Sequence, residues 1–189
     1  MKEVKTETYR ILGVDPGTNI LGYGIVEVEN KTMKLVDLGV LYLKNEADQP
    51  DKLKRIFEQL QTIIGEYKPK EMAIEAPFYG KNVQSMFKLG RAQGVAIAAA
   101  ITKGLTVTEY SPKKIKQAVT GNGNAAKEQV AAMLGTILKA DLNDQYADAT
   151  DALATAVCHF YQSTSRLGAG KKSKDWSAFM KDNPDRVKK

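Results

Sequence analysis

The chain has 189 residues, of which 43% are hydrophobic and 26% charged, and its formal net charge is +6. These values fit one globular domain with a sizeable core, and a single cysteine excludes an intramolecular disulfide. The charged N-terminal segment lacks the apolar stretch of a secretory signal, and the longest apolar run, residues 95–101, is too short to cross a bilayer. We therefore expect a cytoplasmic protein with no membrane segment.

Three strands are predicted first, over residues 9–14, 23–29 and 35–43, which are rich in Val, Ile and Leu. Asn30, Lys31 and Thr32 suit a hairpin connection between the second and third strands. A helix is then predicted, because apolar side chains recur at helical spacing over residues 51–67 and Pro50 suits its first turn.

The rest of the chain alternates between short strands and helices. Two strands are expected, over residues 71–75 and 105–110. Four helices are expected, over residues 82–103, 115–119, 125–139 and 147–161, with Asn124 as the N-cap of the third of them. Three leading strands suit an antiparallel meander, and the later strands alternate with helices as parallel crossovers require. The sequence therefore predicts an α/β fold with a five-stranded mixed sheet flanked by helices.

Charge is unevenly distributed along the chain. Residues 79–127 hold eight Lys and Arg against one acid, which favours a polyanionic partner, although a solvated helix face would explain the same charges. Residues 163–189 are polar and rich in Gly, Lys and Ser, with eight basic residues against three acids. We expect one domain over residues 1–162 and a flexible basic tail over 163–189.

Four carboxylates occupy positions that local structure does not demand. Asp15 ends the first predicted strand and Glu75 ends the fourth, while Asp148 and Asp151 share one face of a small, apolar final helix. Each acid alone has an ordinary structural explanation: a turn, an exposed strand end or a favourable helix dipole. Strand ends of an α/β sheet converge at one edge, however, so the four carboxylates are expected to meet there.

A cluster of four carboxylates needs cations. Buried like charges repel each other and lose hydration, which costs roughly several kcal/mol of free energy. Hard divalent ions such as Mg²⁺ or Mn²⁺ remove that cost. Two such ions about 4 Å apart activate water and stabilise the leaving oxygen in phosphodiester hydrolysis. The acids therefore predict a metal-dependent hydrolase site.

Two other features carry less information. The glycines of residues 17–24 lack the spacing of a nucleotide-binding loop and no helix follows them, so Gly17 and Gly24 are interpreted as permitting a turn and close backbone packing. Cys158 and His159 are adjacent near the end of the last helix and are interpreted as packing residues, since one Cys and one His do not make a zinc site.

Five motifs occur in order over residues 9–161. They are DPG (15–17), IEAPF (74–78), KLGRAQGVA (88–96), IKQAVTGNGNAAKEQV (115–130) and DATDALATA (148–156). Together they resemble the RuvC Holliday-junction resolvases. That resemblance implies a ribonuclease H-like fold and a homodimer that cuts two opposing strands of four-way junction DNA symmetrically with Mg²⁺. It also implies a role in DNA recombination and repair, and the RuvAB branch-migration motor as a partner.

The resemblance also assigns the acids. The family's catalytic acids match Asp15, Glu75, Asp148 and Asp151, which would hold two Mg²⁺ per subunit, with Mn²⁺ as a substitute. Some members carry His where this chain has Asp148, so the all-carboxylate form applies. Ala76 and Pro77 depart from the family pattern, which leaves the path of that loop open.

A DNA-binding surface is expected beside the acids. Lys116 and Lys127 match family residues that contact the junction backbone, and a Lys in the first turn of a helix, as at 127, is not favoured by the helix dipole. Phe78 falls where the family stacks an aromatic ring on an unpaired base. The full predicted DNA-binding set is Phe78, Tyr79, Lys81, Lys113, Lys114, Lys116 and Lys127.

Alternative functions remain open at this point. A related ribonuclease H-like nuclease acting on RNA shares the acids, and a non-catalytic junction-binding protein shares the fold. An actin-like ATPase or sugar kinase also follows a strand-end Asp with Gly, but those folds duplicate the domain and 189 residues hold one such motif. The helix over 82–103 is rich in Gly and Ala, which suits close packing against a second copy in a two-fold dimer.

Overall fold

The computed structural model describes residues 8–77, 82–142 and 145–168. Its sheet has the strand order β3-β2-β1-β4-β5, in which β1 pairs antiparallel with β2 and β2 antiparallel with β3, whereas β1, β4 and β5 run parallel. The strands are β1 (Tyr9–Asp15), β2 (Ile20–Glu29), β3 (Thr32–Tyr42), β4 (Glu71–Glu75) and β5 (Thr106–Tyr110). The predicted five-stranded mixed sheet is confirmed.

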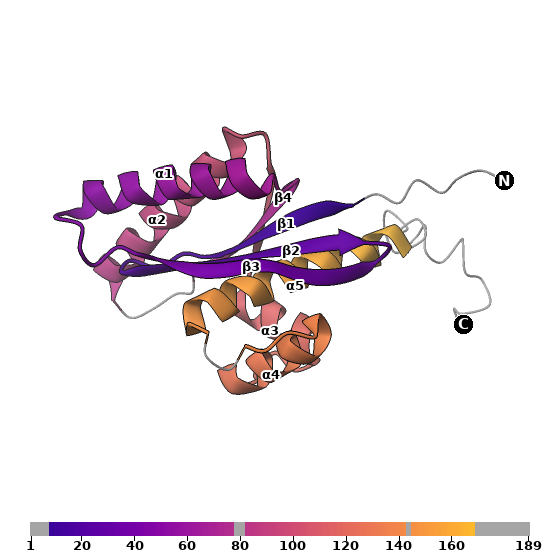
Figure 1. Cartoon of the computed structure of the whole chain (residues 1–189). Helices are drawn as coiled ribbons and strands as arrows, with labels where there is room; N and C mark the ends of the chain where they lie inside the picture. Colours follow the sequence, from indigo (N-terminus) through magenta and orange to yellow (C-terminus); the bar gives the residue numbers. More distant parts are fainter. Residues whose placement is uncertain (1–7, 78–81, 143–144, 169–189) are drawn as a thin grey trace, which may run out of the picture.

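Helices cover both faces of the sheet, as Figure 1 shows. The helices are α1 (Gln49–Tyr67), α2 (Val83–Ile101), α3 (Pro112–Thr120), α4 (Lys127–Leu138) and α5 (Ala147–Gly168). One core joins the sheet to α1 and α2, and the other joins it to α3, α4 and α5. Along β1, Leu12 and Val14 belong to the first core and Ile11 to the second, as the period of two in a strand requires.

Helix α5 lies very close to the sheet because glycines face it. A side chain at Gly13 would overlap the backbone of Ala152, and one at Gly22 would overlap the backbone of Asp148. Gly24 likewise abuts the Leu153 backbone, which confirms the predicted close packing at this glycine. Three glycines on two strands thus let the α5 backbone approach where any other residue would force it away.

Several element boundaries differ from the sequence predictions. β2 begins three residues early, at Ile20, and Asn30 and Lys31 form the hairpin turn with φ of 50° and 64°. The prediction that Asn124 caps the third of the later helices is wrong: α4 has Ala126 as its N-cap, and the Gln129 side chain accepts the Ala126 N–H.

The last helix is longer than expected. α5 continues to Gly168, six residues beyond the boundary predicted at 162, and the remainder of the predicted tail lies outside the described residues. Within the part of the chain that the structure describes, no helix is both long enough and apolar enough to span a membrane.

Candidate functional site

The four predicted carboxylates come from three elements that meet at one edge of the sheet. Asp15 and Glu75 are the last residues of β1 and β4, two adjacent parallel strands. Asp15 pairs with Gly22, and Gly22 abuts the backbone of Asp148 in the first turn of α5. Asp151 follows Asp148 by nearly one helical turn, so both face the same side.

Burial and mutual repulsion perturb the two strand-end acids. Burial raises the pKa of Asp15 to about 7, with further contributions from the charges of Asp151 and Asp148. Burial likewise raises the pKa of Glu75 to about 7, followed by the charges of Asp15 and Asp151. These cross-effects place the carboxyl groups in one shared electrostatic field, which is the environment expected of a functional site.

Two lysines moderate this negative charge. The Lys127 ammonium lies 2.5 Å from Asp151 Oδ2 and lowers the pKa of both Asp15 and Glu75, while Lys116 lowers that of Glu75. The hydrogen bond to Asp151 raises the pKa of Lys127 itself. The structure thus brings both family-matched lysines to the acids, and it pairs Lys127 with a carboxylate.

The chemistry of this donor set fits a hard divalent cation. Four carboxylates offer only oxygen ligands. The pKa values of Asp15 and Glu75 are raised first by burial and then by mutual repulsion, and a divalent ion would relieve the repulsion. Among the described residues, no three His, Cys, Asp or Glu side chains are grouped tightly enough to hold an ion in this arrangement. A cation bound at these carboxylates would compete with the Lys127 ammonium for Asp151 Oδ2.

A cavity of about 590 Å³ opens beside the acids, between α4 and α5. Lys127 and Asp151 line it together with small residues such as Ala131, Gly135 and Ala147. Of the four acids, Asp151 is the one that lines this cavity.

The other predicted DNA contacts divide into two groups. Lys113 and Lys114 are exposed on α3, the helix that also carries Lys116. Phe78, Tyr79 and Lys81 lie outside the described residues. Lys113 and Lys114 thus continue the positive charge of Lys116 along the same helix.

Sequence reasoning underestimated His159. Its Nδ1 lies 2.9 Å from the Tyr110 hydroxyl and its Nε2 lies 2.9 Å from Glu71 Oε2, so it is a polar link between α5 and the sheet. Tyr110 in turn accepts the backbone N–H of Ala76, the residue after Glu75. The available signal was a lone His on an apolar helix face opposite a strand that begins with Glu71. Cys158 is a buried packing residue as predicted, and burial raises the pKa of its thiol to about 11.

Comparison with known proteins gives consistent results. The family model described as crossover junction endodeoxyribonuclease RuvC matches residues 11–159. The RuvC protein of Cytophaga hutchinsonii is 57% identical over 185 residues, which cover 97% of this chain and 90% of that protein. The corresponding protein of Christiangramia forsetii is 54% identical over 178 residues, covering 94% and 92% of the two chains.

A solved structure agrees with the fold as well as the sequence. The T. thermophilus RuvC in complex with Holliday junction substrate superposes with a TM-score of 0.77 at 30% identity, covering 85% of this chain and 96% of that one. Its fold is ribonuclease H-like. The strand order of the sheet and the helices on both of its faces in this chain suit that fold. The chain therefore belongs to the RuvC family of crossover junction endodeoxyribonucleases, the Holliday-junction resolvases.

Proposed function

We propose that this chain cuts two opposing strands of a four-way DNA junction symmetrically, by hydrolysis at the site formed by Asp15, Glu75, Asp148 and Asp151. The observation that carries the proposal is the convergence of these acids at one sheet edge, where the pKa values of Asp15 and Glu75 rise to about 7. Such a concentration of negative charge destabilises the fold and is best explained by cation binding.

The cofactor is a pair of Mg²⁺ ions per subunit, for which Mn²⁺ can substitute. Ions bound there supply Lewis acidity toward water and offset the negative charge of the leaving 3′ oxygen. Asp15 and Glu75 are held on adjacent strands and serve as fixed ligands. Asp148 and Asp151 complete the donor set from α5, and Lys127, once released from Asp151, can contact a phosphate.

The DNA path follows the basic residues. Lys116 and Lys127 flank the acids and are assigned to the phosphates near the cut, while Lys113 and Lys114 extend the contact along α3. Phe78, Tyr79 and Lys81 follow Glu75 in the chain and are assigned to an unpaired base at the opened crossover. This division separates residues that position the backbone from residues that recognise an open junction.

Symmetric cleavage needs two sites, and α2 offers the surface to pair them. Val83, Phe87 and Ile101 are 63%, 66% and 56% exposed, and they fall on one stripe of the helix with Gly90 and Gly94. A side chain added at either glycine would meet open space, so a second helix can approach closely there. A two-fold dimer through this stripe matches the two-fold symmetry of a junction.

In the cell we assign the protein to the cytoplasm, where it acts in DNA recombination and repair with the RuvAB branch-migration motor. That partner is proposed from family membership. Four-way junction DNA is proposed from the T. thermophilus relative, whose structure is of a complex with Holliday junction substrate.

The test is cleavage of a synthetic four-way junction with mapped nicks, with and without Mg²⁺. Asp15→Asn should abolish cleavage while junction binding persists, because the amide removes a charged ligand and leaves the DNA surface intact. Glu58→Gln is the matched control, since Glu58 is an exposed α1 acid paired only with Lys54 in the described salt bridges. Wild-type cleavage by Asp15→Asn would refute the proposed site, and preferred cutting of an RNA substrate would support the related RNA nuclease instead.

A further inference from the structure

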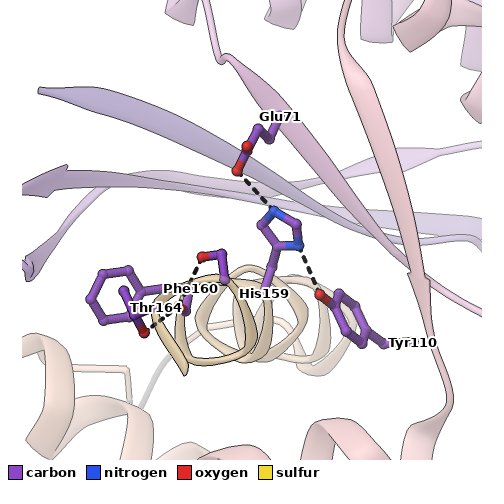
Figure 2. A network of polar contacts seen from close by, with 6 residues as sticks. Glu71, Tyr110, His159, Phe160 and Thr164 are labelled. Carbon is purple, nitrogen blue, oxygen red and sulfur yellow. Dashed lines mark hydrogen bonds and ion pairs between the residues drawn. The ribbon is translucent and has the colours of Figure 1, made fainter. Parts of the chain in front are cut away.

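His159 lies at the centre of a polar network between α5 and the sheet, drawn in Figure 2. The ring is 7% exposed, and its two nitrogens contact Glu71 and Tyr110 at 2.9 Å each. A neutral imidazole satisfies both contacts when Nε2–H donates to the Glu71 carboxylate and Nδ1 accepts the Tyr110 hydroxyl. Both contacts join a residue of α5 to the first or last residue of a strand.

The spacing along β4 and α5 relates this network to the acids. Glu71 and Glu75 are the two ends of β4, four residues apart, which is about 13 Å at the rise of a strand. Asp151 and His159 are eight residues apart on α5, which is about 12 Å at the rise of a helix. The two elements run in opposite directions, so a contact between Glu71 and His159 at one end brings Asp151 level with Glu75 at the other.

Tyr110 extends the network to the active-site edge. Its carbonyl oxygen accepts the Ala76 N–H at 2.8 Å, directly after Glu75, and its ring lies under the Lys114 ammonium, 5.1 Å from the ring centroid. Tyr110 thus connects the network to the end of β4 through its backbone and to α3 through its ring.

We propose that Glu71 and His159 are a positioning pair that fixes the register of α5 along β4 and so sets the spacing of Asp151 and Asp148 from Glu75 for divalent cation binding. This inference rests on the proposed function of the four carboxylates. The rival explanation is that the close contacts of α5 with Gly13, Gly22 and Gly24 fix the register without help.

The experiment measures Mn²⁺ binding to the full chain by electron paramagnetic resonance, beside thermal unfolding and junction cleavage. Glu71→Met removes the acceptor at a partly exposed strand end and should weaken Mn²⁺ binding several-fold, because α5 loses the contact that sets Asp151 and Asp148 relative to Glu75. Glu71→Gln keeps a side-chain oxygen for the His159 N–H and should stay within about 2-fold of wild type. His159→Phe should repeat the Glu71→Met result.

Leu138→Ala is the matched control for lost stability, because Leu138 is buried in the same core but lies on α4, outside the network. It should lower the melting temperature and leave Mn²⁺ affinity unchanged. Glu71→Met that lowers the melting temperature without changing Mn²⁺ affinity would overturn the proposal in favour of the glycine contacts. Asp15→Asn that binds Mn²⁺ as tightly as wild type would instead refute the proposed metal site itself.

Discussion

Asp15 is a partly buried carboxyl group placed among three others, and the fold keeps it there against its own electrostatic cost. Desolvation is the largest cause of its raised pKa, and the nearby charges of Asp151 and Asp148 add to it. Lys127 offsets part of the repulsion from a single exposed side chain. The residue thus stores an unfavourable interaction that a divalent cation would release.

That interaction predicts an unusual pH dependence in the absence of divalent ions. The folded-state pKa of Asp15 is about 7 against an ordinary 3.8, so the folded chain keeps a proton that the unfolded chain releases between about pH 4 and 7. Stability should therefore fall as the pH rises through that window. Asp15→Asn should remove on the order of 2 kcal/mol of this loss, and thermal unfolding in EDTA at pH 5 and pH 8 measures it.

Comparing Asp15→Asn with wild type separates the pH dependence caused by Asp15 from that caused by the other acids of the chain. Added Mg²⁺ should raise the melting temperature of wild type at pH 8 and leave that of Asp15→Asn nearly unchanged. Equal loss of stability with pH in both proteins would contradict the prediction.

Helix α5 is held to the sheet by glycine contacts, so one added methyl group should separate the acids. A methyl group at Gly22 would overlap the Asp148 carbonyl oxygen. Both groups are held by the backbone, so only a backbone shift can relieve the overlap. Gly22→Ala should therefore cost about 1–3 kcal/mol of unfolding free energy and abolish cleavage. Urea unfolding and junction cleavage measure the two effects.

Gly65→Ala is the control, because Gly65 lies within α1 and a methyl there meets open space. It should stabilise the chain by about 0.5–1 kcal/mol through helix propensity and leave cleavage intact. A Gly22→Ala variant with normal stability and cleavage would contradict the prediction, because it would show that α5 can move away from the sheet without separating the acids.

How far the sequence predicts each element depends on whether its cause is local. Helix α1 was predicted to within two residues at each end, because its apolar stripe and Pro50 are local signals. The start of β2 was predicted three residues too late because Gly22 looks like a loop residue. Its glycine is required instead by the α5 backbone, more than 120 positions away in the sequence. Likewise, the acids were predicted from local features, two strand ends and one helix face. The partners of His159 could not be predicted, because they depend on the register of α5 along β4.

At the scale of the whole molecule, the α2 stripe should determine oligomeric state. Phe87→Glu places a charge at the centre of the proposed interface and should convert a dimer to a monomer in size-exclusion chromatography with light scattering, while the fold is kept. Junction binding should weaken, because paired sites no longer act on one substrate.

Val36→Glu serves as the matched control, since Val36 is a partly exposed apolar residue of β3 rather than α2. It should leave the dimer intact. A wild-type monomer at micromolar concentration, or a Phe87→Glu dimer, would rule out this interface.

The order of the chain has a consequence for when the enzyme acquires activity. β1 and β4 are made early, but the face of β1 that carries Asp15 packs closely against α5, which begins at Ala147. Until that helix leaves the ribosome, the nascent chain has half of its acids and an open core, and it folds late through contacts of high sequence separation. On the proposed function, the catalytic site is therefore completed only after α5 has been synthesised.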